Sequence, residues 1–312
     1  MKAIAASDLP VANGKIYHLA ITSEQLAKDI IIVGDPDRVT IIADEYLVKR
    51  EFEAFHRGLR TITGTTKDGL RVTVVTSGMG TPSLEIVLGE IVALNEIDFA
   101  TMTRKPSHEM INIIRVGTSG GLRKETQLGT PILTAYAVGL DNTGLFYDAP
   151  YADDGCRVIE KKVRDAIHEV VKSPRFKTAI HPYVARADPT LVQAMEESAR
   201  ERKVRVIKGV TASSAGFFAN QGRDIARVSP TVVDVDWVLG SLGAVHEGLA
   251  IENMEMESSF LLHFMGALGY RAGSICPAIA NRKEETFTAS YVQNVKDSTE
   301  VALGALAKLR KR

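Results

Sequence analysis

The stretch Ile30-Ile-Ile-Val-Gly-Asp-Pro-Asp-Arg38 decides the fold of this chain. It begins with four consecutive β-branched aliphatic residues, a run typical of a strand that is buried on both faces of a sheet. Gly34 follows that run, and we predict a helix over residues 39–45. A glycine at the carboxyl end of a buried strand, leading into a helix, is where α/β folds place ligands. Free N–H groups and Arg38 can hold an anion there, although an Asp-Pro turn that caps a helix explains the same residues.

A second junction between a strand and a glycine loop follows a hairpin predicted for residues 61–65 and 70–76. The hairpin leads into Ser77-Gly-Met-Gly-Thr-Pro-Ser83, and an apolar helix is predicted over residues 84–95. Ser83 stands where a dinucleotide-binding loop has its third glycine. A dinucleotide-dependent oxidoreductase is therefore disfavoured.

A third junction, Asn112-Ile-Ile-Arg-Val-Gly-Thr-Ser-Gly-Gly121, carries an arginine within the apolar strand itself. The loop that follows this strand offers backbone amides and hydroxyl groups. A guanidinium fork at Arg115, a hydroxyl group of the loop and free N–H groups together favour an anion site over a purely structural role.

Strands and helices alternate along the chain, which indicates an α/β fold whose sheet is covered by helices on its faces. Further strands are predicted over residues 131–138, 204–211 and 273–280, and further helices over residues 157–171, 189–202, 230–245 and 291–308. No linker is visible in the sequence. We therefore expect a single domain over residues 1–312, with residues 1–14 as a flexible arm.

The charge balance of the chain excludes some classes of partner. Lys and Arg number 38, as do Asp and Glu, so no overall field attracts nucleic acid or an anionic membrane, and any anion site must be local. Cys156 and Cys276 are far apart and lack metal-ligand spacing, which fits a reducing cytosol. The chain has no signal-peptide core and no apolar stretch long enough to span a bilayer, so we expect a cytoplasmic protein.

Three carboxylates lie among apolar residues in Ile251-Glu-Asn-Met-Glu-Met-Glu-Ser-Ser259. Helical spacing would put Glu255 and Glu257 on different faces, so at least one of them is expected to point inward. One interpretation is an acidic helix N-terminus, which suits the helix dipole. The other is a carboxylate that accepts hydrogen bonds from the vicinal hydroxyls of a ligand.

Two aromatic residues precede Gln221 and Arg223 in Ala212-Ser-Ser-Ala-Gly-Phe-Phe-Ala-Asn-Gln-Gly-Arg223. Such a segment can form a flat apolar slot with an amide and a guanidinium at its edge, as a planar heterocycle requires. A loop with buried phenylalanines and surface polar residues explains the same pattern.

Four motifs together resemble the nucleoside phosphorylase-I family, and within it the branch that cleaves uridine. They are Gly34-Asp-Pro-Asp-Arg38, Arg115-Val-Gly-Thr-Ser-Gly120, Gln221-Gly-Arg223 and Glu255-Met-Glu257, and the resemblance covers residues 16–310. It implies a three-layer α/β/α fold with a mixed, twisted, partly barrel-like central sheet. It also implies a pentosyltransferase of pyrimidine salvage that converts uridine and phosphate reversibly into uracil and ribose 1-phosphate. Inorganic phosphate is then the co-substrate, and no organic cofactor is expected.

The resemblance further implies roles for individual residues. Phosphate is expected to contact Gly34, Arg38, Arg115 and Thr118, together with Arg50 of a neighbouring subunit. Ribose is expected to contact Glu257, Glu255 and Met256, together with His18 of a neighbouring subunit. The base is expected to contact Phe217, Gln221 and Arg223, with Arg282 in support. The four residues implied in catalysis are Arg115, Arg223, Gln221 and Glu257.

The shared site implies a homo-oligomer, at least a dimer, and some relatives in the family bind a monovalent cation between subunits. The positions that match this cation site, here for K⁺, are Glu51, Met79 and Ser83.

Three alternatives remain at this point. A purine nucleoside phosphorylase of this kind would carry an aspartate where the chain reads Ala280-Asn281-Arg282. A nucleosidase that uses water would have less use for Arg38, Arg50 and Arg115. A non-catalytic nucleoside-binding module would not need residues for both co-substrates.

Overall fold

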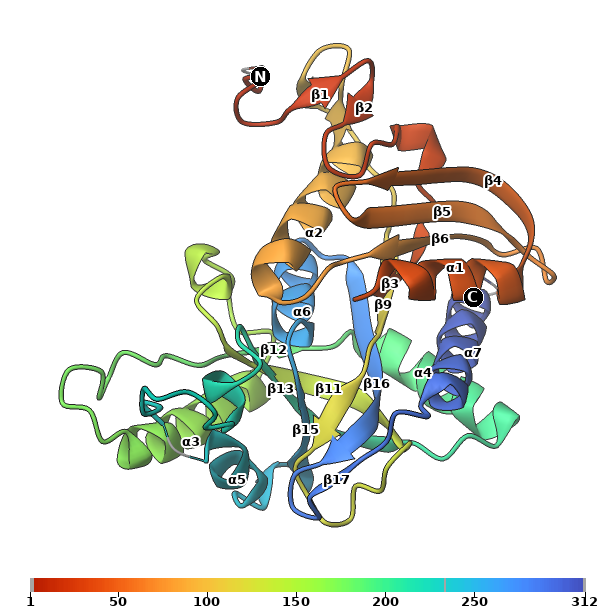
Figure 1. Ribbon diagram of the computed structural model, residues 1–312. Helices are drawn as coiled ribbons and strands as arrows, with labels where there is room; N and C mark the ends of the chain where they lie inside the picture. The colour runs from red at the N-terminus through yellow and green to blue at the C-terminus, as the bar shows by residue number, and fades with distance from the viewer. Residues whose placement is uncertain (1–2, 233, 311–312) are drawn as a thin grey trace. The chain divides into compact units, whose positions relative to one another are not determined.

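The computed structural model describes residues 3–232 and 234–310 (Figure 1). The chain divides into two compact units. The first comprises Met1–Met79 and Ser83–Ile114, and the second comprises Gly80–Pro82 and Arg115–Arg312. The single domain and the flexible arm expected from the sequence stay predictions.

The first unit is built on a mixed sheet with the strand order β9-β3-β6-β5-β4. Its strands are β3 (Asp29–Val33), β4 (Leu47–His56), β5 (Leu59–Thr66), β6 (Arg71–Thr76) and β9 (Asn112–Val116), the last of which continues into the second unit. β3 and β6 are parallel, whereas β5 runs antiparallel to both of its neighbours, β4 and β6. The helices are α1 (Pro36–Tyr46) and α2 (Thr81–Glu96), with α2 in this unit from Ser83 onward.

Shorter elements complete the first unit. They are β1 (Val11–Ala12), β2 (Lys15–Ile16), η1 (Ser23–Gln25), β7 (Ile97–Asp98) and β8 (Thr103–Arg104). β1 pairs with β2, and β7 pairs with β8, both antiparallel.

The strand and helix predicted at the start of the chain are confirmed. All five residues of β3 are buried, as an unbroken β-branched run requires. Asp35 lies between β3 and α1 and accepts a hydrogen bond from the Asp37 N–H at 2.9 Å, so it acts as the N-cap of α1. Pro36 occupies the first turn, where its missing N–H costs nothing. The hairpin was also predicted correctly, but the long strand β4 was missed.

The second unit contains a ring of five strands. β11 (Pro131–Leu140) pairs with β13 (Ile207–Ser214), β13 with β15 (Leu249–Glu255), β15 with β10 (Ser119–Gly121), β10 with β16 (Arg271–Asn281), and β16 again with β11. The ring mixes parallel and antiparallel pairs, so the expected mixed, partly barrel-like sheet of an α/β fold is confirmed. β12 (Tyr183–Arg186), β14 (Ala244–His246) and β17 (Thr286–Phe287) pair with single strands of the ring.

Helices surround this ring. They are α3 (Asp154–Val170), α4 (Pro189–Arg202), α5 (Val235–Gly240), α6 (Ser258–Ala267) and α7 (Val292–Leu309), with single 3₁₀ turns at η2 (Gly144–Phe146) and η3 (Ala219–Gln221). α3 buries one stripe of side chains, Cys156, Ile159, Val163 and Ile167, at helical spacing against the core. α4 and α7 pack on each other, as Figure 1 shows. No helix in the described parts of the chain is both long and apolar enough to cross a bilayer.

One sequence expectation for the second unit was wrong. Among the described residues of the stretch 230–245, the predicted helix is limited to α5, because the chain turns through Gly243 at a φ of +64° and pairs as β14 with β15. Residue 233 of that stretch lies outside the described residues.

The acidic stretch divides between two elements. Residues 249–255 form β15, a strand that was missed, and α6 begins at Ser258 with Glu257 as its N-cap residue. The interpretation as an acidic helix N-terminus, with Ser258 and Ser259 in the first turn, is therefore confirmed for Glu257.

Candidate active site

Arg115 is the centre of a buried cluster in the second unit. It lies on β9, its side chain is 5% exposed, and its two terminal nitrogens bind carboxylates. Nη2 pairs with Glu257, and Nη1 lies 3.2 Å from Glu255 Oε2 and 2.9 Å from Cys276 Sγ. Burial acts to lower the pKa of this guanidinium, but the acidic groups around it raise the pKa well above its ordinary value. Arg115 is therefore a permanent positive charge.

The position of Arg115 depends on the residue two places after it. A Cβ atom at Gly117 would lie 1.7 Å from Arg115 Nη1, so any side chain there would displace the guanidinium. The remaining nitrogen of Arg115, Nε, is buried and has no hydrogen-bond partner among the described residues. A buried N–H without an acceptor costs about 1–3 kcal/mol, so this atom favours a ligand that brings an acceptor. Thr118, the next residue after Gly117, is half-buried in the loop between β9 and β10.

The two carboxylates beside Arg115 have different surroundings. Glu255 ends β15 and accepts the backbone N–H of Glu257 at 3.1 Å, the N–H of Ser258 at 3.0 Å, and the Ser213 hydroxyl. The Glu255 oxygens thus hold the backbone at the start of α6 through these hydrogen bonds. Both carboxylates are buried, so the expectation that at least one points inward is confirmed.

Glu257 is the N-cap residue of α6 and faces a different set of groups. It accepts hydrogen bonds from Arg115 and from the backbone N–H of Gly80. Burial raises the pKa of its carboxyl group above the ordinary value, even though Arg115 opposes this shift. The methyl group of Met256 lies 3.8 Å from the point where a Cβ at Gly80 would stand, so this segment is closely packed.

The residues that hold Gly80 in place were not identified from the sequence. The Thr81 hydroxyl is 2.9 Å from the Thr143 hydroxyl. Asp141 in turn accepts the N–H groups of Thr143 at 2.9 Å and Gly144 at 3.2 Å. A buried aspartate thus supports, through two threonines, the segment whose backbone binds Glu257.

Gln221, Arg223 and Phe217 lie together, as the sequence predicted for a slot with a polar edge. Arg223 Nη1 donates to Gln221 Oε1 at 2.8 Å and to the Phe217 carbonyl at 2.6 Å. The Arg223 guanidinium carbon lies 3.9 Å from the centre of the Phe217 ring. Gln221 is buried, whereas half of the Phe217 side chain is exposed and free to meet a ligand.

Arg282 lies beside this group through a residue that sequence reasoning missed. Its Nε donates to Asp236 Oδ2 at 2.7 Å, and its Nη2 is 3.5 Å from the carbonyl of Gly222. Asp236 lies within residues 230–245, for which the sequence predicts one helix. Burial, and next the positive charge of Arg282, lower the pKa of Arg223.

In the first unit, His18 is oriented by an acidic residue of α2. Glu90 Oε1 lies 2.7 Å from His18 Nδ1 and accepts the His18 backbone N–H at 2.8 Å, while Oε2 accepts the Leu19 N–H at 2.8 Å. A carboxylate partner favours the tautomer with the proton on Nδ1, which leaves Nε2 as an acceptor. Glu90 interrupts the apolar run of residues 86–94 in α2, and a glutamate within such a run was a signal for this role.

The other predicted residues of the first unit lie at several places. Gly34 connects β3 to α1, and Arg38 lies half-buried in the first turns of α1. Arg50 on β4 pairs with Asp44.

The three positions matched to a cation site are also in the first unit. Glu51 accepts from Arg71 Nε at 2.8 Å, and this hydrogen bond lowers the pKa of the carboxyl group. The Ser83 hydroxyl donates to the Ser77 carbonyl at 2.6 Å, and the Met79 side chain is exposed. The proposed cation therefore stays a prediction.

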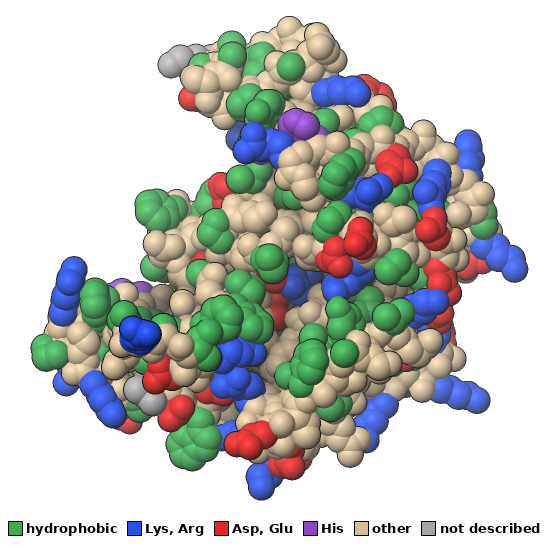
Figure 2. All heavy atoms as spheres, viewed as in Figure 1, with side chains coloured by type: hydrophobic (Ala, Val, Ile, Leu, Met, Phe, Trp, Pro, Cys, Tyr) green, Lys and Arg blue, Asp and Glu red, His purple; other side chains and the backbone are tan. Residues whose placement is uncertain are grey.

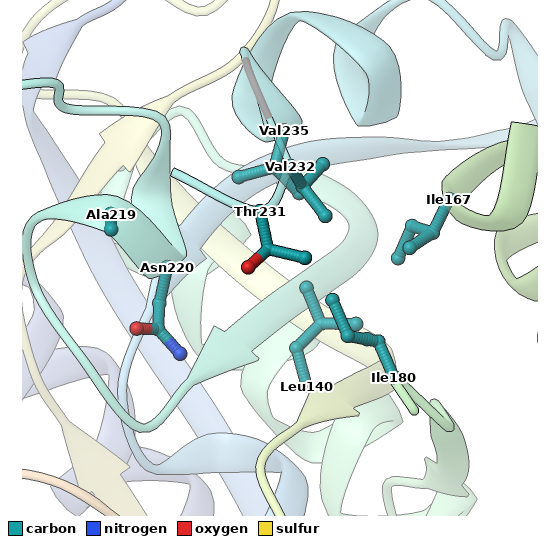
Figure 3. Close-up of a pocket in the computed structure, with 8 residues that line it drawn as sticks. All are labelled: Leu140, Ile167, Ile180, Ala219, Asn220, Thr231, Val232 and Val235. Atoms are coloured by element: carbon teal, nitrogen blue, oxygen red, sulfur yellow. The ribbon is translucent and has the colours of Figure 1, made fainter. Parts of the chain in front are cut away.

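A cavity of about 230 Å³ in the second unit is a poor candidate for the chemistry (Figure 3). Its walls are mostly apolar and come from β11, α3, α5 and the loops between them: Leu140, Ile167, Ile180, Ala219, Asn220, Thr231, Val232 and Val235. None of these side chains is ionisable, so the cavity offers neither charge nor an acid or base. On the face shown in Figure 2, acidic and basic side chains are interspersed.

The chain belongs to the phosphorylase superfamily, whose sequence profile matches residues 28–310. It is accordingly a pentosyltransferase. It is similar to the uridine phosphorylase of Thermococcus kodakarensis, with 28% identity over 287 residues that cover 92% of this chain and 84% of the relative.

Two further comparisons bear on the branch of the family. A crystal structure of the Trypanosoma brucei nucleoside phosphorylase, described as showing uridine phosphorylase activity, matches with a TM-score of 0.87 and 29% identity, covering 96% of this chain and all of that one. A DeoD-type purine nucleoside phosphorylase of Bacillus subtilis is 33% identical, but only over 37% of this chain and 44% of the relative. The similarity to purine enzymes of this type is therefore partial.

We predict that Gly117→Ala destabilises the protein by about 1–3 kcal/mol, because the new methyl group overpacks the space that the Arg115 guanidinium fills. The matched control is Gly120→Ala, since no atom lies within 4 Å of the position of its added Cβ. The control should change the free energy of unfolding by less than about 0.5 kcal/mol. Urea unfolding of both variants measures the difference, and equal stabilities would contradict the assigned contact.

Proposed function

We propose that the protein catalyses the reversible phosphorolysis of uridine to uracil and ribose 1-phosphate. The proposal rests above all on the group formed by Gln221, Arg223 and Phe217. An amide joined to a guanidinium at 2.8 Å, beside an aromatic ring, offers a donor–acceptor edge and a flat apolar face. Uracil has the complementary carbonyl, N–H and carbonyl groups along its edge. The names of the relatives that match most of the chain support the same substrate.

The reaction needs no nucleophile from the protein. A phosphate oxygen attacks C1′ of the ribose, the C1′–N1 bond breaks, and its electron pair remains on uracil. Positive charge develops on the sugar and negative charge on the base. Donors from Gln221 and Arg223 to the uracil carbonyls would stabilise that negative charge in the transition state, and the loss of one such donor commonly costs about 2.7–4 kcal/mol. Holding phosphate and nucleoside in line also accelerates the reaction, because the two substrates are already oriented for attack.

Arg115 supports phosphate as the second substrate. It is a permanent cation whose buried Nε lacks an acceptor among the described residues, and a phosphate oxygen can supply one. We assign Arg38, Thr118 and the backbone of Gly34 to the same anion, together with Arg50 of a neighbouring subunit.

The ribose is assigned to Glu257 and Met256, with Glu255 behind them. An ionised carboxylate accepts hydrogen bonds from two vicinal hydroxyls, and Glu257 is less occupied by the protein than Glu255 is. We assign His18 of a neighbouring subunit to the ribose 5′-hydroxyl, because Glu90 leaves its Nε2 as an acceptor.

Sharing of residues between subunits makes the proposed enzyme a homo-oligomer, at least a dimer. We further propose that it acts in the cytoplasm in pyrimidine salvage and that K⁺ binds near Glu51, Met79 and Ser83 between subunits.

The purine alternative is disfavoured by the surroundings of Asn281. Its Nδ2 donates to the carbonyls of Arg123 at 2.9 Å and Thr126 at 2.7 Å. Its Oδ1 accepts the N–H groups of Lys283 at 2.9 Å and Glu284 at 3.0 Å. An amide that is fully engaged in this way cannot protonate a purine. A nucleosidase is disfavoured because a reaction with water would give Arg38, Arg50 and Arg115 no anionic substrate to bind.

The first test is the release of free base from uridine with and without phosphate, with inosine in a parallel reaction. We expect uracil only when phosphate is present, and little hypoxanthine. Release of uracil without phosphate would identify a nucleosidase. Preferential cleavage of inosine would overturn the assignment of Gln221 and Arg223 to uracil.

The raised pKa of Glu257 predicts how nucleoside binding depends on pH. The Glu257 carboxyl group can accept hydrogen bonds from two ribose hydroxyls with both of its oxygens only when it is ionised. The affinity for uridine should therefore fall as the pH drops through the pKa of this group. Because burial raises that pKa, the fall should be centred above the ordinary glutamate value of about 4.3. Calorimetric titration with uridine, without phosphate, between about pH 8 and pH 5 measures it. Glu257→Gln should bind weakly and without this pH dependence, and a parallel fall in that variant would assign the titration to another group.

The shared site predicts complementation between two inactive variants. Arg50→Ala and Glu257→Ala should each abolish uridine cleavage. In a mixed dimer one of the two sites has both residues, so mixing the refolded chains should restore part of the activity. Each variant refolded alone serves as the control. Verified heterodimers that remain inactive would show that Arg50 does not act across the interface.

A further inference from the structure

Residues 217–223, here called the base loop, carry the three side chains assigned to uracil. In the described residues this loop makes few main-chain hydrogen bonds to the rest of the protein. Among the described residues, its main-chain hydrogen bonds are internal: Gln221 and Arg223 donate to the Phe218 carbonyl at 2.9 and 3.0 Å, and Gly222 donates to the Ala219 carbonyl at 3.2 Å. Gly222 has a left-handed φ of +74°. The loop therefore needs side chains from elsewhere to fix its position.

Packing behind the base loop is incomplete. The cavity of about 230 Å³ is lined on one side by Ala219 and Asn220 of the loop and on another by Val235 of α5 (Figure 3). Side chains do not fill this space, so the loop and α5 make fewer packing contacts there than they would in a filled core. Polar contacts must then supply the restraint.

Asp236, the residue after Val235, supplies such contacts in two directions. Its side chain is 10% exposed, and Oδ2 accepts from Arg282 Nε at 2.7 Å. Its other oxygen, Oδ1, would lie 2.2 Å from a Cβ added at Gly222, so the carboxylate occupies the space beside the loop's glycine. Arg282 also reaches the Gly222 carbonyl at 3.5 Å. The aspartate and the arginine therefore meet the loop at the same glycine.

Asp236 also balances charge in this region. Arg282 and Arg223 are both cationic, and the charge of Arg282 acts to lower the pKa of Arg223 while Asp236 acts to raise it. Without the carboxylate, two guanidinium groups would face each other in a partly buried setting. Like charges held in this way repel, and the more mobile group moves.

We propose that Asp236 is a positioning residue for base recognition: it anchors Arg282 and Gly222 so that Gln221 and Arg223 present one fixed edge to the base. This inference rests on the proposed function of the base loop. It concerns the base alone, so the sugar and phosphate contacts should not depend on Asp236.

The test compares Asp236→Asn with Asp234→Asn in the direction of nucleoside synthesis. Asp234 is a matched control, because it is exposed, lies two residues away, and has a left-handed φ of +53° that asparagine tolerates. Asp236→Asn should raise the KM for uracil about tenfold, which corresponds to leaving one charged partner unbalanced. The KM for ribose 1-phosphate should change less than about twofold. Equal changes in both constants would overturn the inference in favour of a general structural role.

A double variant tests whether Asp236 acts through Arg282. If it does, Asp236→Asn with Arg282→Gln should be no worse than the more impaired single variant, because removing both charges removes the repulsion on Arg223. Fold-changes that multiply would show that the two residues act independently, against the proposal.

Hydrogen exchange of the peptide covering residues 216–224, without any substrate, separates this inference from the proposed function. Asp236→Asn should exchange several-fold faster than the wild type there, while Asp234→Asn should not. Unchanged exchange in Asp236→Asn would overturn the positioning role whatever the substrate is. A wild-type enzyme that fails to cleave uridine would overturn the proposed function, and the exchange result would still decide whether Asp236 holds the loop.

Discussion

One guanidinium shared by two buried carboxylates holds the site of the second unit together. Arg115 comes from β9, Glu255 from the end of β15, and Glu257 from the start of α6. Removing one member of such a buried group leaves an unbalanced charge and costs about 3–5 kcal/mol. The interaction therefore fixes three elements at once, and it does so where the ring of strands meets the helix that follows it.

The same cluster places two carboxyl groups against a single cation. Burial raises the pKa of Glu257 and of the nearby Cys276 thiol. Because two carboxyl groups already face Arg115, this arginine alone would hold a dianion such as phosphate weakly. The proposed function, following the family resemblance, adds Arg38 and Arg50 as further cations. The balanced total charge of the chain agrees with an anion site of this local kind.

The sequence predicted those parts of the fold and site that depend on neighbouring residues. The unbroken run in β3, the capped helix after it, and the closeness of Phe217, Gln221 and Arg223 all follow from short-range pattern. Around Glu255 the sequence predicted the start of the helix but missed the strand β15 before it, because the boundary between strand and helix falls inside this stretch. On a helix the carboxylates would diverge, whereas here Glu255 ends a strand and binds the backbone N–H groups that open α6.

Residues that hold the functional side chains in place were harder to find, because they are distant in sequence. Glu90 is 72 residues from His18, and Asp236 is 46 residues from Arg282. Their partners are set by how the chain returns on itself, which no local motif records. A polar residue in an apolar segment is nevertheless a usable signal, since burying a charge is costly unless a partner compensates it. Glu90 offers this signal, because it interrupts an apolar run of α2, although no role was assigned to it from the sequence. Asp236 lies in a short helix with mixed surroundings, so only its contacts with Gly222 and Arg282 identify it.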